Sequence, residues 1–71
     1  MKTVYDVQQL LKRFGTFIYT GDRRSDMELM QSEISELYKF KVIDVEEYRM
    51  ALLILRREVN RVISEKGEDN E

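Results

Sequence analysis

The sequence predicts an all-α protein, a compact three-helix bundle, from three observations. Apolar residues recur every three or four positions along three separate segments, as in helices with one buried face. The chain has no proline, and each segment follows a residue of a type that caps helix N-termini. The β-prone stretch over residues 16–21 is too short and isolated to pair with another strand. With 71 residues in all, we expect one small domain over residues 1–63.

The first helix is expected over residues 4–14. Thr3 precedes it as an N-cap, and Asp6 three residues later completes a capping-box pattern. Gly15 marks its C-terminal end. The next residues form a connector whose Phe17, Ile18 and Tyr19 should pack partly on the core. The residues of the first helix that share its apolar face are Val4, Val7, Leu10, Leu11 and Phe14.

The second helix is expected over residues 22–40, with Asp22 or Ser25 as its cap. The third is expected over residues 45–64, after Asp44 and Glu47 in a second capping-box pattern. Residues 64–71 contain four acidic residues and no apolar one, which predicts a frayed, flexible acidic tail. The two apolar stripes are Met27, Met30, Ile34, Leu37 and Tyr38, and then Tyr48, Ala51, Leu52, Leu55, Val59 and Val62.

The third helix is apolar on more than one face, because Met50, Leu53 and Ile54 lie off its main stripe. A helix in a simple bundle needs about three apolar positions in seven. Two interpretations follow. The helix is sandwiched between the other two, or these three residues form a contact surface for a partner.

Composition excludes most catalytic and metal chemistry. The absence of histidine and cysteine removes the usual general base, disulfides and thiolate metal sites. The serines have no histidine partner, and no glycine-rich segment matches a phosphate-binding loop. We therefore expect no enzyme, no cofactor and no metal. The longest apolar run, residues 50–55, is far short of the roughly 20 residues of a membrane span, so we expect a soluble cytoplasmic protein without membrane contact.

Basic and aromatic residues form the most suggestive pattern. The net charge is −2, but residues 1–63 carry eleven basic and ten acidic side chains. Arginine suits phosphate binding, and aromatic rings can stack on bases. Arg57 and Arg61 lie one helical turn apart, where their like charges repel each other, and a bound anion would relieve this repulsion. The candidate phosphate contacts are Lys12, Arg13, Arg23, Arg24, Arg49, Arg56, Arg57 and Arg61, and the candidate stacking faces are Phe17 and Tyr19.

The same residues also have a purely structural interpretation. Several of the cations lie in the last turns of helices, where they complement the helix dipole, and arginine stems cover apolar surface. Phe14 and Tyr48 are expected in the core, and so are Phe17 and Tyr38, although Phe17 is also a candidate stacking face. The start of the second helix could bind an anion through its free N–H groups, unless Asp22 caps it.

Three strings carry a resemblance to a known family: residues 5–11 (Tyr-Asp-Val-Gln-Gln-Leu-Leu), residues 15–22 (Gly-Thr-Phe-Ile-Tyr-Thr-Gly-Asp) and residues 51–56 (Ala-Leu-Leu-Ile-Leu-Arg). With them the chain resembles the YqgQ-like family of small bacterial proteins of unknown function, over residues 3 to about 60. The resemblance implies a compact three-helix bundle from the bacterial cytosol. It brings no catalytic residue or cofactor, and it modestly raises the hypothesis of single-stranded nucleic-acid binding.

Two functions are therefore predicted as alternatives. In the first, the chain is a non-enzymatic domain that binds single-stranded RNA or DNA weakly through its basic residues. In the second, it is a protein–protein interaction or homodimerisation module that uses Met50, Leu53 and Ile54 on the third helix.

Overall fold

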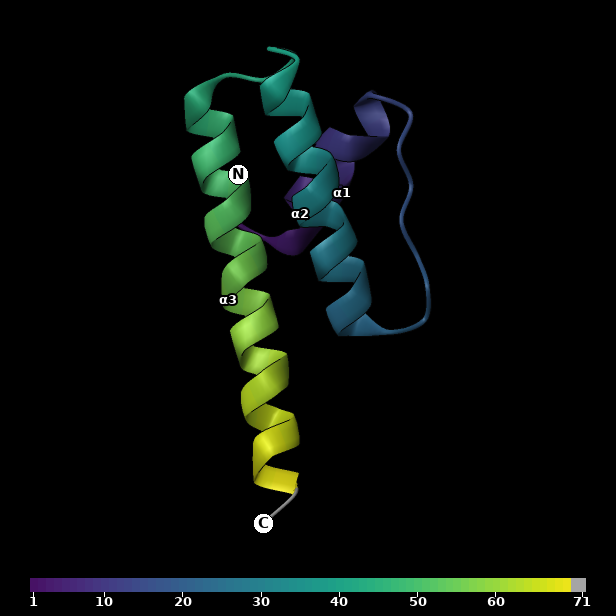
Figure 1. The fold of residues 1–71 in the computed structure, drawn as a ribbon, viewed down its shortest axis with the longest axis vertical. Helices are drawn as coiled ribbons and strands as arrows, with labels where there is room; N and C mark the ends of the chain where they lie inside the picture. Colours follow the sequence, from purple (N-terminus) through teal and green to yellow (C-terminus); the bar gives the residue numbers. More distant parts are fainter. Residues whose placement is uncertain (70–71) are drawn as a thin grey trace.

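The computed structural model describes the backbone of residues 1–69 and the side chains of residues 1–64. It contains α1 (Val4–Arg13), α2 (Arg23–Lys39) and α3 (Val45–Asp69), with no strand among the described residues. α2 and α3 form a long antiparallel hairpin, α1 packs against both, and an extended connector runs along the outer side of α2 (Figure 1). The predicted all-α three-helix bundle is confirmed.

The N-termini of the helices are capped as the sequence predicts. At α1, the backbone N–H of Asp6 donates to Thr3 Oγ1 at 3.3 Å, and the N–H of Thr3 donates to the Asp6 carboxylate at 3.0 Å. Asp44 and Glu47 make the same reciprocal pair before α3. Asp22 caps α2 by accepting from the N–H three residues later at 3.0 Å. Because the Asp22 carboxylate already occupies the N-terminus of α2, this helix end does not offer a free site for a bound anion.

The C-termini of α1 and α2 close with the same hydrogen-bonding pattern, the Schellman motif. After α1, Gly15 adopts a φ of +81°, and the Thr16 N–H donates to the carbonyl five residues earlier at 3.0 Å. After α2, the left-handed position is held by Lys41 at a φ of +61°, and the Val42 N–H makes the equivalent bond at 2.8 Å. The second turn therefore carries a side chain where glycine is usual.

The core lies between α2 and α3 and is covered by α1. Ile34 of α2 and Leu55 of α3 are fully buried, and Ile43 in the turn between these helices is buried with them. This confirms most of the predicted apolar stripes as the packing faces, although Tyr38, predicted on the stripe of the second helix, is 39% exposed. The core residues are Val7, Leu10, Leu11, Met27, Met30, Ile34, Ile43, Ala51, Ile54 and Leu55.

Two aromatic predictions are wrong. Phe14 was expected in the core but is 40% exposed, because it caps α1 where that helix ends beside α2, away from α3 (Figure 1). Phe17 and Tyr19 were expected to pack partly on the core but are 74% and 79% exposed. The connector alternates its side chains, so only Ile18 between them packs on the core. Tyr48 does pack on the core, with its ring stacked on that of Tyr38 at 4.1 Å.

The third helix departs from the prediction in two respects. Ile54 is not on an outer surface, because it belongs to the core and is only 7% exposed. Met50 and Leu53 are exposed, as the contact-surface interpretation requires. α3 also continues to Asp69, past the expected end at residue 64. A flexible tail was predicted for residues 64–71. The side chains of residues 65–71 and the backbone of residues 70–71 lie outside the described part of the chain. Among the described residues, no helix is long and apolar enough to cross a membrane.

Candidate nucleic-acid interface

The predicted basic residues do not share one face. Lys12 and Arg13 lie at the end of α1, next to the connector. A second group surrounds a hollow where the starts of α1 and α2 meet α3. The members of the second group are Arg23, Arg57 and Arg61, and the remaining cations, Arg24, Arg49 and Arg56, belong to neither group.

The first group stands beside exposed aromatic rings. The Lys12 ammonium lies 5.3 Å from the centroid of the Phe17 ring, and the Arg13 guanidinium lies 5.9 Å from that of Phe14. Both distances fall within the range of cation–π attraction. Tyr19 presents a further exposed ring two residues along the connector from Phe17. The end of α1 and the connector thus bring the Lys12 cation together with exposed rings, while Arg13 next to it also lines a separate hollow between α1 and α3.

The connector is held at both ends although it has no regular secondary structure. At its far end, the buried carboxylate of Asp26 accepts hydrogen bonds from the Thr20 backbone N–H at 2.7 Å and from Thr20 Oγ1 at 2.6 Å. At its near end, the turn at Gly15 anchors it to α1. Ile18 packs on the core between these points. The exposed rings therefore project from a positioned backbone.

A small hollow of about 190 Å³ lies between α1 and the connector. Tyr5, which is 65% exposed, and Phe17 stand among its lining residues. Gln8 and Gln9 add side-chain amides, which can donate and accept hydrogen bonds. The other lining residues are Leu11, Lys12, Thr16, Ile18 and Met30. Flat rings, amides and an ammonium together can contact a base by stacking and by its polar edge.

The second group of cations converges on one carboxylate. Glu58 of α3, whose side chain is 12% exposed, accepts from Arg61 Nη2 at 2.8 Å and from Arg23 Nε at 2.7 Å. The hydrogen bonds from Arg61, and then those from Arg23, lower the pKa of Glu58 to about 2. These residues line a hollow of about 440 Å³ that also includes Lys2, Tyr5 and Arg57.

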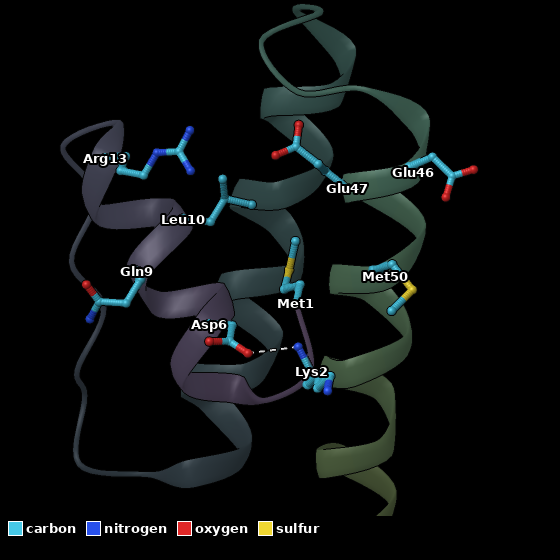
Figure 2. Close-up of a pocket in the computed structure, with 9 residues that line it drawn as sticks. All are labelled: Met1, Lys2, Asp6, Gln9, Leu10, Arg13, Glu46, Glu47 and Met50. Carbon is cyan, nitrogen blue, oxygen red and sulfur yellow. Dashed lines mark hydrogen bonds between the residues drawn. The ribbon is translucent and has the colours of Figure 1, made fainter.

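A third hollow, of about 540 Å³, lies between α1 and the first half of α3 (Figure 2). Its charges are mixed, since Asp6, Glu46 and Glu47 line it together with Lys2 and Arg13. The Asp6 carboxylate accepts from the backbone N–H groups of Lys2 and Thr3, which lower its pKa. This balance does not favour a phosphate. Among the described residues, no group of three acidic side chains is arranged to hold a metal ion.

Sequence reasoning missed several residues of these surfaces. One is Asp26, which lies four residues before buried Met30 and therefore on the apolar side of α2. That spacing was a usable signal. Nothing in the sequence indicates that Tyr5 and Lys2 border the cationic hollow, because this depends on how α1 crosses α3.

The fold and these surfaces define a small all-α domain with shallow hollows. Residues 1–61 match the sequence pattern of the YqgQ-like family. The chain is also 44% identical over 69 residues to the uncharacterized protein YqgQ of Bacillus subtilis (strain 168), an alignment that covers 97% of this chain and 94% of that protein. The chain belongs to the YqgQ-like family, which confirms the resemblance seen in its sequence.

Proposed function

We propose that this protein is a non-enzymatic domain that binds single-stranded nucleic acid on the surface formed by the end of α1 and the connector. The observation that carries the proposal is the exposure of Phe17 and Tyr19, at 74% and 79%, on a backbone that hydrogen bonds and packing hold in place. Exposed apolar rings that gather in one patch mark a binding surface, whereas single exposed apolar side chains are common.

The geometry of the connector suits stacking. Phe17 and Tyr19 lie two residues apart and project on the side away from Ile18, so their Cα atoms are at most about 7 Å apart. Consecutive unpaired bases can stack on such rings, at about 1 to 3 kcal/mol per base. Stacking tolerates any base, so we expect little sequence preference from these two residues.

Charge supports the same location. Residues 1–21 carry three basic side chains and one acidic one, in a chain whose net charge is −2. Lys12 lies beside the Phe17 ring and would contact a phosphate, and Arg13 beside Phe14 at the end of α1 would add a second contact. With two or three such contacts, the logarithm of the affinity should fall with the logarithm of salt with a slope of about −1.4 to −2. Binding should therefore be weak at physiological salt.

Fluorescence anisotropy tests the proposal. Labelled single-stranded RNA and DNA are titrated with protein at low and near-physiological salt, with a duplex of the same sequence for comparison. We expect preference for the single strand, and a Phe17→Ala, Tyr19→Ala double variant should lose most of the binding. Phe40→Ala is the matched control, because Phe40 is 67% exposed but lies at the far end of α2. Absence of binding at low salt, or equal effects of the two variants, would contradict the proposal.

The alternative function, association with a protein partner or a second copy through α3, retains Met50 and Leu53 but has lost Ile54 to the core. The remaining apolar surface is smaller than the sequence indicates, so the nucleic-acid function has the stronger support. Light scattering at high concentration tests the alternative. A dimer that Leu53→Asp dissociates without unfolding the chain would favour it.

A further inference from the structure

The cationic hollow beside Glu58 lies outside the stacking surface. Four cations line it, each from a different position in the fold: Lys2 before α1, Arg23 at the start of α2, and Arg57 and Arg61 one turn apart on α3. Among the residues whose side chains the structure describes, Glu58 is the one acidic residue in this lining. These described lining residues therefore carry a formal excess of three positive charges, on a chain whose net charge is −2.

Glu58 does not neutralise this excess. Its carboxylate is engaged by Arg23 and Arg61, with three hydrogen bonds of 2.7 to 3.0 Å. Within the described part of the chain, no acidic group pairs with the Lys2 ammonium or the Arg57 guanidinium. Arg57 also stands one helical turn from Arg61, where like charges repel each other. An anion in the hollow would relieve that repulsion and give Lys2 and Arg57 a partner.

We propose that this hollow is a binding site for a phosphomonoester dianion, held by Lys2, Arg23, Arg57 and Arg61. A guanidinium matches two phosphate oxygens in a bidentate pair, and an ammonium adds a compact charge. The dianion suits the site because it matches the excess of positive charge more closely than a monoanion does. The volume of about 440 Å³ accommodates the phosphate together with a small organic group, for which the exposed ring of Tyr5 provides a wall.

Tyr5 also lines the hollow beneath Phe17, so the two sites are neighbours. The phosphate could therefore belong to a free small molecule or to the phosphorylated end of a nucleic-acid strand. The chemistry at the hollow is the same for both sources. The proposal does not depend on stacking at the connector, since none of the four cations is part of that surface.

Nuclear magnetic resonance with the full chain tests the site. Inorganic phosphate is titrated into the protein at pH 7.5, and a sodium chloride titration at matched ionic strength serves as the control. The Arg57 Nε–H signal and the backbone amide signal of Thr3 are followed. We expect saturable shifts with phosphate. Arg57→Gln should weaken binding about tenfold, the effect of losing one charge-assisted hydrogen bond. Lys2→Gln should weaken it in the same direction, and Arg56→Gln, with the same charge change outside the hollow, should not.

A second arm separates the two sources of phosphate. Pentanucleotides with a 5′-phosphate or a 5′-hydroxyl are compared by anisotropy. If the 5′-phosphate raises the affinity for the pentanucleotide and Arg57→Gln abolishes this gain, the ligand is a phosphorylated strand end. If inorganic phosphate binds saturably but the 5′-phosphate adds no affinity, the ligand is a free phosphomonoester. The phosphate titration should be unchanged in the Phe17→Ala, Tyr19→Ala variant, which separates this site from the stacking surface. Shifts that do not saturate, or that Arg57→Gln and Arg56→Gln reduce equally, would overturn the proposal.

Discussion

Arg23 at the start of α2 and Glu58 in the middle of α3 are joined by a hydrogen bond of 2.7 Å between Nε and Oε2. The two residues are 35 positions apart in the chain, and Glu58 also accepts from Arg61 on its own helix. The carboxylate thus ties the open end of the α2–α3 hairpin together. Its largely buried position makes the contact more stabilising than an exposed ion pair.

This contact predicts a dependence of stability on pH. The pKa of Glu58 is lowered from 4.5 to about 2 in the folded chain, so the unfolded chain binds the proton first as pH falls. The stabilisation is therefore complete above about pH 4.5 and is lost between about pH 4.5 and pH 2. Glu58→Gln should cost roughly 1.5 to 3 kcal/mol at pH 7 and flatten this part of the profile. Urea unfolding at several pH values measures both. If the free energy of unfolding of the variant depends on pH as that of the parent does, other carboxyl groups dominate this dependence.

The left-handed residue after α2 predicts a stabilising substitution. Lys41 has a φ of +61°, which costs a residue with a Cβ about 1 kcal/mol or more and costs glycine little. Lys41→Gly should raise the free energy of unfolding by up to about 1 kcal/mol, whereas Lys41→Ala should not. Thermal unfolding of the two variants makes the comparison. Equal stability of both would mean that the turn is not strained.

The contact between Asp26 and Thr20 predicts that stability and binding change together. Asp26→Ala removes the acceptor of two hydrogen bonds and should destabilise the chain by about 1 to 3 kcal/mol. Because the connector then loses its far anchor, hydrogen exchange at the Thr20 amide should speed up and oligonucleotide affinity should fall. Glu28→Ala on the exposed side of α2 is the control, with a change expected within about 0.5 kcal/mol. Unaltered exchange at Thr20 would refute this role.

Burial predicts opposite outcomes for two neighbouring leucines of α3. Leu55 is fully buried, so Leu55→Ala should cost about 2 to 5 kcal/mol. Leu53 is 45% exposed, and Leu53→Ala should change stability by no more than about 0.5 kcal/mol. Chemical denaturation of the two variants tests this. A large loss from Leu53→Ala would indicate that its outer face is covered, which would favour association through α3.

Much of the fold could be predicted because its signals are local. Thr3 with Asp6, and Asp44 with Glu47, satisfy backbone groups within one helical turn, so sequence spacing is enough to find them. Gly15 is found equally well, since a left-handed turn favours glycine. The candidate site was predicted less completely. Phe17 and Tyr19 were recognised as stacking faces, but the cations expected to accompany them proved to be divided over the molecule.

The sequence by itself determined where the three helices begin, where α1 and α2 end, and which stripe of each helix is apolar, because capping and periodicity act over a few residues. Only the tertiary structure decided that Ile54 is covered and Phe14 is not, since this depends on how the short α1 lies against the α2–α3 hairpin. The same packing brings Lys2, Arg23 and Arg57 around one hollow. Contacts between residues far apart in the chain follow from the relative placement of helices, which no local pattern encodes.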